Sequence, residues 1–318
     1  MKTKLGVVMD PLESIKPNKD STLAMMQAAQ ARGWQIFEIQ QNSIFLTKDQ
    51  VFGRCREVNI HIDQTNYFSV VNSWTTSLEE MDIVLLRKDP PFDMEYIYTT
   101  YLLELLEKKG VPVLNKPSSI RDCNEKLYAL EFPECCPEYL VSRDEKVLRD
   151  FYEEHQDIVF KPLDGMGGSS VFRVSPKDKN LGVIIETLTQ HGKFQTMAQK
   201  YLPAIRDGDK RILIINGEPI PYALARIPSA NENRGNLAAG GKGVGKKLTK
   251  QDHFICDLVG KSLVSKGLYF VGIDVIGDYL TEINVTCPTC IRELDQAFGL
   301  NIGDEYIHFI EKEILSSG

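Results

Sequence analysis

The amino-acid sequence predicts an α/β protein in which an N-terminal parallel-sheet domain is followed by two smaller α+β units. The chain has 318 residues, which is enough for two or three domains at about 150 residues each. Short apolar runs alternate with helical patterns through the first 115 residues, as is typical of a parallel sheet with crossover helices. Beyond residue 124, strands and helices mix without this regular alternation.

In the N-terminal part, strands are predicted at 5–9, 34–39, 82–86 and 111–114. One helix is predicted at 21–32, with Asp20 or Ser21 as its N-cap and Gly33 after its end. A second is predicted at 94–109, before Gly110. Its spacing places four apolar side chains on one face: Tyr98, Leu102, Leu105 and Leu106.

The remaining chain is predicted to form two α+β units. Helices are expected at 124–131, 144–155, 181–190 and 250–266, with two more at the C-terminus, and strands at 139–141, 157–161, 171–174, 195–200, 211–215, 220–226, 270–276 and 280–285. Asn216-Gly217 favours a type I′ hairpin turn. The segment 228–245 holds five glycines and three asparagines, which predicts a long mobile loop. We therefore expect domains at 1–122, 123–200 and 201–318.

Composition and charge argue against several classes of protein. The 37 basic and 44 acidic residues give a net charge of −7, so a general basic surface for nucleic acid is not expected. The first apolar run ends at Asp10 and is too short for a signal peptide or a membrane span. Seven cysteines are too few, and odd in number, for a secreted disulfide framework. We expect a cytoplasmic protein with reduced thiols and no membrane or nucleic-acid partner.

A glycine-rich loop is the first candidate binding feature. Residues 165–168 include three glycines, whose backbone N–H groups can approach an anion closely. Predicted strands flank the loop, so it would be a hairpin loop over phosphates, with Lys161 at the end of the preceding strand. The Walker and Rossmann patterns are both missing. An ordinary tight hairpin is the alternative.

The pattern Glu282-Ile-Asn284 suggests a metal site. Alternation along a strand puts both oxygen-bearing side chains on one face, and such ligands suit Mg²⁺. A two-residue turn at 277–278 would pair Asp274 with Thr281, whereas a three-residue loop would pair it with Glu282. The metal interpretation therefore needs the longer loop. A solvated polar strand face is the alternative.

Two arginines flank the Asn216-Gly217 turn. Counting outward from the turn pairs Arg211 with a residue near 222, so Arg211 and Arg226 need not touch. Either arginine could face a polyanion in a cleft. The alternative is that both are exposed strand residues without a functional role. Farther on, Cys287-Pro-Thr-Cys290 precedes a predicted helix, whose dipole would favour a thiolate at Cys287 and a redox role. Two incidental thiols are the alternative.

In their order, these motifs resemble the ATP-grasp superfamily, and more narrowly the bacterial-type glutathione synthetase family, over about residues 3–310. The stretches that carry the resemblance include Arg87-Lys-Asp-Pro-Pro-Phe-Asp93, Asn115-Lys-Pro117, 121–126, 161–170, Tyr201-Leu-Pro, Gly208-Asp-Lys-Arg211, Ala225-Arg-Ile-Pro228, 234–241 and 282–293. The chain departs from the family pattern at Cys287, where serine is expected, and at Lys242, where arginine is expected. The implied fold is an ATP-grasp fold whose two α+β subdomains sandwich ATP.

The resemblance implies a role for each candidate residue. ATP would be bound by nine residues: Lys126, Lys161, Gly165, Gly167, Gly168, Gln199, Tyr201, Leu202 and Asp209. Two Mg²⁺ ions, for which Mn²⁺ could substitute, would be held by Asp274, Glu282 and Asn284. Four residues would act at the transferring phosphoryl group or close over it: Arg211, Arg226, Arg234 and Gly241. Arg87 and Arg292 would bind substrate carboxylates.

The implied reaction joins γ-glutamylcysteine to glycine and converts ATP to ADP and phosphate, in a homotetramer. ATP would activate a carboxylate as an acyl phosphate, which the glycine amine attacks. The 228–245 loop would exclude water from this intermediate. Three alternatives remain: another ATP-grasp ligase, such as a D-alanine ligase or one that adds amino acids to a protein; a nucleotide-binding regulator without turnover; and a redox protein acting through Cys287 and Cys290.

Overall fold

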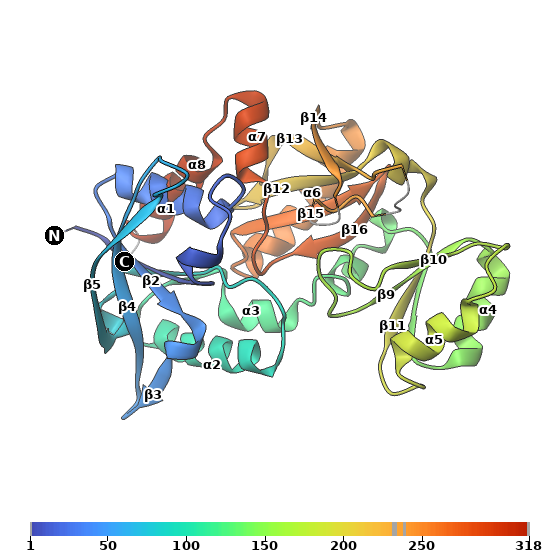
Figure 1. The fold of residues 1–318 in the computed structure, drawn as a ribbon, viewed down its shortest axis with the longest axis horizontal. Helices are drawn as coiled ribbons and strands as arrows, with labels where there is room; N and C mark the ends of the chain where they lie inside the picture. The colour runs from blue at the N-terminus through green and yellow to red at the C-terminus, as the bar shows by residue number, and fades with distance from the viewer. Residues whose placement is uncertain (1, 231–233, 238–239, 317–318) are drawn as a thin grey trace.

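The computed structural model describes residues 2–230, 234–237 and 240–316, which form three sheets with helices packed on them. Figure 1 shows the N-terminal sheet domain on the left and the four-stranded central sheet on the right. The five-stranded C-terminal sheet lies between them. The predicted succession of one sheet domain and two smaller α+β units is confirmed.

The N-terminal sheet is mixed rather than wholly parallel. Its strands are β1 (Lys4–Met9), β2 (Gln35–Gln40), β3 (Phe45–Thr47), β4 (Gln50–Ile60), β5 (Phe68–Ser77), β6 (Ile83–Leu86) and β7 (Val113–Leu114). Strands β2, β1, β6 and β7 run parallel in that order, as predicted. Strands β3, β4 and β5 extend the sheet antiparallel beyond β2 and were not predicted.

Helices of the N-terminal domain are α1 (Ser21–Ala31), α2 (Met94–Lys108) and α3 (Pro117–Asp122). Asp20 caps α1, as predicted, through the backbone N–H of Leu23. The predicted apolar face of α2 is correct in part: Leu106 is buried, but Tyr98 is 52% exposed and Leu105 37% exposed. The full buried face is formed by Tyr96, Thr99, Thr100, Leu103 and Leu106.

The central sheet is antiparallel, in the order β10-β9-β11-β8. Its strands are β8 (Tyr139–Ser142), β9 (Ile158–Pro162), β10 (Phe172–Val174) and β11 (Thr196–Lys200), covered by α4 (Glu145–His155) and α5 (Leu181–Thr189). A separate apolar core, which includes Leu148, Phe160 and Ile185, holds this unit together. The predicted helix at 124–131 is wrong, because only Tyr128–Glu131 is helical, as a 3₁₀ turn.

The C-terminal sheet has the order β14-β13-β12-β15-β16, all antiparallel. Its strands are β12 (Asp209–Ile215), β13 (Glu218–Ile227), β14 (Lys242–Lys247), β15 (Phe270–Ile276) and β16 (Tyr279–Asn284), and its helix is α6 (Lys250–Ser265). Asn216 and Gly217 have φ of 50° and 82°, which confirms the type I′ turn. Two apolar clusters join this sheet to the N-terminal domain: one includes Val8 and Ile273, and the other includes Leu5 and Phe270.

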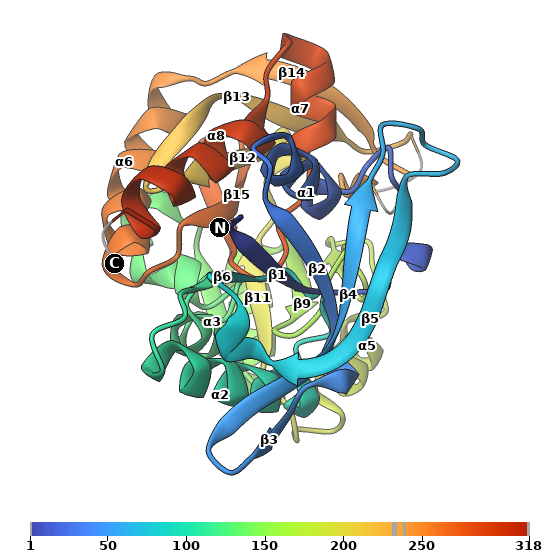
Figure 2. The same ribbon diagram turned by 90° about the vertical axis from the view of Figure 1, so that its left-hand side faces the viewer.

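The last helices are α7 (Ile291–Phe298) and α8 (Ile302–Phe309), followed by a π-helical turn at Ile310–Ile314. Helix α8 packs beside α1, as Figure 2 shows, and Arg32 pairs with Asp304 between them. Helix α8 therefore packs on, and is ion-paired to, the N-terminal domain. Remaining 3₁₀ helices lie at Leu12–Ser14, Gln41–Ser43, Leu78–Glu80, Pro133–Cys135 and Pro203–Asp207.

The predicted loop at 228–245 is too long, because Lys242–Lys247 forms strand β14 against β13. Glycine is required within this strand. A Cβ atom on Gly245 would lie 2.5 Å from the ring of Phe298, which stacks on Tyr222. Residues 231–233 and 238–239 of the predicted loop lie outside the described part of the chain.

All seven cysteines lie in the described part of the chain and are free, in agreement with the prediction of reduced thiols. Within the same residue ranges, no helix combines the length and apolar character needed to cross a membrane.

Candidate functional site

Two adjoining cavities lie where the central and C-terminal sheets face each other. The first is lined by twelve of the predicted site residues: Lys126, Lys161, Gly165, Gly167, Gly168, Gln199, Tyr201, Leu202, Asp209, Arg234, Asp274 and Glu282. The second is lined by Arg211, Arg226, Asn284 and again Gly165, Gly167 and Glu282. We call these the first and second cavities. They share Glu282 and the glycine loop, so one molecule in each would meet there.

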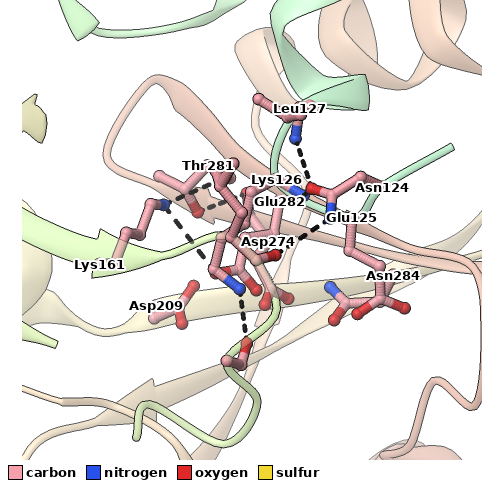
Figure 3. Close-up of polar contacts among 12 residues, drawn as sticks. Asn124, Glu125, Lys126, Leu127, Lys161, Asp209, Asp274, Thr281, Glu282 and Asn284 are labelled. Atoms are coloured by element: carbon pink, nitrogen blue, oxygen red, sulfur yellow. Dashed lines mark hydrogen bonds and ion pairs between the residues drawn. The ribbon is translucent and has the colours of Figure 1, made fainter. Parts of the chain in front are cut away.

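Two lysines converge on Glu282 at this meeting point (Figure 3). The Nζ atoms of Lys126 and Lys161 lie 3.6 and 3.9 Å from Glu282 Oε1. Burial lowers the pKa of Lys161, and Glu282 opposes this shift. Lys126 Nζ also donates to the carbonyl oxygen of Gly165, at 2.6 Å. The position therefore gathers cationic groups around the glycine loop, as phosphate binding requires.

The pairing of Asp274 with Glu282 is confirmed, but not by the predicted route. The turn has two residues, because Ile276 pairs with Tyr279. A β-bulge between Asp274 and Val275 accommodates Thr281 as an extra residue and restores the Asp274–Glu282 pair. The Thr281 hydroxyl donates to the carbonyl oxygen of Asp274, at 3.1 Å. The bulge thus brings the candidate metal ligands to one face despite the short turn.

Both candidate arginines contact Asp274, a common partner that counting outward from the turn did not predict. A register shift near Ile212 and Ile214 pairs Arg211 with Leu224 rather than with a residue near 222. Arg211 donates to both oxygens of Asp274, at 2.5 and 3.1 Å, and Arg226 Nη2 lies 2.9 Å away. Although burial opposes ionisation, these cations hold the pKa of Asp274 well below its usual range.

Asp209 closes the network on the other side of Arg226. Its Oδ2 pairs with Arg226, whereas its Oδ1 is buried and has no hydrogen-bond partner in the described structure. Burial, with added repulsion from Asp274 and Glu282, raises the pKa of Asp209 to about 6. Because Asp209 also lines the first cavity, its free oxygen is available to a hydroxyl group of a ligand.

The donor set at the meeting point fits a hard divalent cation. Glu282 supplies a carboxylate, and Asn284 donates its amide N–H to Gly272, so its side-chain oxygen remains an acceptor. Asp274 would have to share its carboxylate with two arginines. Across residues 2–230, 234–237 and 240–316, no group of three or more His, Cys, Asp or Glu residues forms a metal cage. A cation here would therefore need oxygens from a ligand, as Mg²⁺ commonly does.

The glycine loop contacts the described part of the segment after β13. Gly168 has φ of 78°, and a Cβ atom on it would lie 2.6 Å from Asn236 Oδ1. Arg234 donates to the carbonyl oxygen of Gly168. The predicted residue Gly241 lines neither cavity but supports this contact, since its backbone N–H donates to Asn236. The two segments thus form one cover over the part of the first cavity that lies beside the glycine loop.

Arg87 and Arg292 are not brought to either cavity. The Arg87 guanidinium is buried, donates to Thr22 and to the carbonyl oxygen of Pro288, and lies over the Phe270 ring. Arg292 donates to Gln27. Arg87 therefore holds the Pro288 loop, which lines the second cavity, against α1 and β15.

The predicted thiolate at Cys287 is wrong. Burial raises the pKa of Cys287 to about 12, and its Sγ donates to the carbonyl oxygen of Arg87, at 3.2 Å. Burial also raises the pKa of Cys290, the residue before α7. Desolvation therefore outweighs the helix dipole, which contributes about 0.3–1 kcal/mol. Both thiols line the second cavity in their neutral form.

Glu125 is a central residue that sequence reasoning missed. Its Oε1 accepts hydrogen bonds from the backbone N–H groups of Val285 and Thr286 and from the Thr286 hydroxyl, at 3.0, 3.1 and 2.8 Å. Its carbonyl oxygen accepts the N–H of Ile283. Glu125 therefore fastens the loop that carries Lys126 to the end of β16, which carries Glu282 and Asn284. Only its place beside Lys126 could have singled it out.

Two family models match the chain. "Prokaryotic glutathione synthetase, N-terminal domain" matches residues 3–121, and "Prokaryotic glutathione synthetase, ATP-grasp domain" matches residues 125–299. Glutathione synthetase of Pseudomonas syringae pv. tomato is 55% identical over 314 residues, covering 99% of this chain and 98% of that protein. Glutathione synthetase of Escherichia coli (strain K12) is 50% identical over 311 residues, covering 98% of each.

Solved structures of lower identity share the fold. The ATP-grasp ligase PsnB, in complex with a phosphomimetic variant of its minimal precursor, Mg and ADP, has a TM-score of 0.66 at 17% identity, covering 98% of each chain. D-alanyl-alanine synthetase A from Vibrio cholerae has a TM-score of 0.60 at 14% identity, covering 99% of each chain. These similarities extend to the fold alone.

Proposed function

Since the chain belongs to the prokaryotic glutathione synthetase family of ATP-grasp enzymes, we propose that its two adjoining cavities hold ATP and the pair of molecules to be joined. The enzyme is an ATP-dependent ligase of glutathione biosynthesis. The single observation that supports this use of the cavities is their junction at Glu282 and the glycine loop. A phosphoryl donor in one and a carboxylate acceptor in the other would meet at that junction.

ATP occupies the first cavity with its base toward Gln199, Tyr201 and Leu202. Its phosphates lie under the glycine loop, within reach of Lys126 and Lys161. The unpartnered Oδ1 of Asp209 accepts a ribose hydroxyl. Arg234 and Gly241 hold the cover in contact with the glycine loop.

Magnesium accompanies ATP in ATP-grasp ligases, and PsnB was solved with Mg and ADP. Glu282 and Asn284 would supply oxygen ligands, and Asp274 would have to share its carboxylate between a second ion and the two arginines. Mn²⁺ could substitute for Mg²⁺. The chemistry that a bound Mg²⁺ would supply here is neutralisation of the charge on the phosphoryl group. The protein contributes the strand pair and the bulge that hold these oxygens on one face.

The second cavity holds γ-glutamylcysteine and glycine. Arg211 and Arg226 face it from β12 and β13, held in fixed positions by Asp274 and Asp209. They stabilise negative charge as the cysteinyl carboxylate becomes an acyl phosphate, a step that depends on positioning and electrostatics. The glycine amine then attacks the acyl carbon and phosphate leaves. Arg87 contributes by holding the Pro288 loop, whereas Arg292 is bound to Gln27 and lines neither cavity.

The homotetramer and the cytoplasmic location are carried over from the family resemblance as predictions. Size-exclusion chromatography with light scattering tests the first. D-alanyl-alanine synthetase A and PsnB share only the fold, at 14% and 17% identity, so the function proposed here rests on the relatives of higher identity.

The proposed function is tested by measuring the ADP that the enzyme releases from ATP when γ-glutamylcysteine and glycine are added together or singly. We expect ADP and tripeptide in equal amounts only when both are present. In a parallel reaction, D-alanine is supplied in place of both γ-glutamylcysteine and glycine. Turnover with D-alanine, or ATP hydrolysis without a peptide product, would contradict the proposed function.

A further inference from the structure

Among the described residues, the second cavity contains one carboxylate that has neither a hydrogen-bond or ion-pair partner nor a role in the proposed mechanism. The ionisable carboxylates and guanidinium groups that line it are Asp89, Glu125, Arg211, Arg226 and Glu282. Both arginines are paired with Asp274, Glu125 accepts three hydrogen bonds, and Glu282 faces two lysines. Among the described residues, the carboxylate of Asp89 alone in this set has no hydrogen bond or ion pair.

Asp89 is nevertheless held firmly through its backbone. Its N–H donates to Asp10 Oδ2 at 3.0 Å, and Lys88 Nζ donates to its carbonyl oxygen at 2.5 Å. Lys88 is itself paired with Asp10 Oδ1, at 3.0 Å. Two prolines follow Asp89 and restrict the conformation of the chain. The free carboxylate is therefore presented to the cavity from a fixed backbone.

The surroundings of Asp89 favour the binding of a cation. Asp89 is an exposed residue at the edge of the cavity. Partial loss of water around its carboxyl group, followed by repulsion from Asp10, raises the pKa of Asp89. The nearby cations do not neutralise it directly, because Lys88 is bound to Asp10 and Arg87 to Thr22 and Pro288. A cationic group of a ligand would supply the missing partner.

We propose that Asp89 binds the α-ammonium group of the γ-glutamyl substrate and so selects donors that carry this group. The inference rests on the proposed function of the second cavity. γ-Glutamylcysteine has a single cationic group, at the opposite end from the carboxylate that is activated. The phosphate-binding side chains come from the central and C-terminal sheets, whereas Asp89 follows β6 of the N-terminal domain. The two ends of the donor would thus be bound by residues from different domains that line the same cavity.

The test combines one substitution with one altered substrate. Asp89→Asn removes the charge and keeps the shape, and glutarylcysteine is γ-glutamylcysteine without its α-ammonium group. A hydrogen bond to a charged group is worth about 10–100-fold in binding. We expect Asp89→Asn to raise KM for γ-glutamylcysteine by about that factor, with KM for ATP and glycine unchanged. Glutarylcysteine should be a poor donor for both enzymes, with nearly the same KM.

Glu95→Gln serves as the control, because it removes an exposed carboxylate of α2 that lines neither cavity. It should leave all three KM values unchanged. An equal loss with both donors would overturn the assignment, and so would a rise in KM for glycine in place of γ-glutamylcysteine. Absence of turnover in the parent enzyme would instead contradict the proposed function itself, so the two failures are distinguishable.

Discussion

Removing the Glu125 carboxylate should loosen the end of β16 and weaken the use of Mg²⁺. Glu125→Ala leaves the N–H groups of Val285 and Thr286 without their acceptor. A buried polar group left unpaired costs about 1–3 kcal/mol, so two such groups cost about 2–6 kcal/mol of local stability. Glu125→Gln keeps an acceptor oxygen and should cost only about 1 kcal/mol.

Hydrogen exchange of the 283–287 peptide measures this cost directly, since each 1.4 kcal/mol is a tenfold change in opening equilibrium. Exchange should accelerate strongly in Glu125→Ala and slightly in Glu125→Gln. The Mg²⁺ concentration for half-maximal activity should rise in the same order, because Glu282 and Asn284 precede the loosened residues. Thr286→Ser, which keeps the hydroxyl, is the control. Equal exchange and equal Mg²⁺ dependence in the Ala variant and the parent would refute the role of Glu125.

Three further predictions concern single side chains. Glu282→Gln removes an anionic metal ligand, so turnover should fall at least 100-fold and recover partly at high Mg²⁺. Near-normal activity of this variant at low Mg²⁺ would exclude Glu282 as a Mg²⁺ ligand. The pKa of Asp209 is raised to about 6, so the stability that this group contributes should be lost as the pH rises from about 4 through 6. Urea unfolding should show this loss of stability in the parent and not in Asp209→Asn. If the contribution of Asp209 to stability instead grows over that pH range, its attraction to Arg226 dominates. Because Cys287 is a neutral thiol, oxidised glutathione should inhibit neither the parent nor Cys287→Ser, and inhibition of the parent alone would restore the redox hypothesis.

Local signals in the sequence predicted the parts of the site that depend on neighbouring residues. The glycine loop between two strands, and Lys161 at the end of the first, follow from composition and alternation over a few residues. The Asn216-Gly217 turn follows from the positive φ that these two residues tolerate. Such features need no knowledge of the rest of the fold.

Register depended on contacts that alternation does not encode. Counting from the turns misplaced the partner of Arg211 and required a longer loop for Asp274, because it assumed regular strands. Thr281 is the extra residue of a β-bulge, and its hydroxyl donates to the carbonyl oxygen of Asp274. Nothing in the local sequence indicates this bulge. The shift near Ile212 likewise brings both arginines to one carboxylate.

Side-chain burial also depended on partners distant in the sequence. The face of α2 was chosen from its leucines, but Thr99 and Thr100 share the buried face with Leu103. Glu125 acts on residues 160 positions away. Lys242–Lys247 pairs with β13 as a strand, and Gly245 leaves room for the Phe298 ring against it. These outcomes follow from packing between elements, which a single sequence states only indirectly.

The most direct test of the account is the peptide product formed when ATP, Mg²⁺, γ-glutamylcysteine and isotopically labelled glycine are supplied together. The account predicts labelled glutathione in amounts equal to ADP, with oxygen from an ¹⁸O-labelled donor carboxylate appearing in the released phosphate. Phosphate without that oxygen, or glycine left unincorporated while ADP accumulates, would contradict ligation through an acyl phosphate.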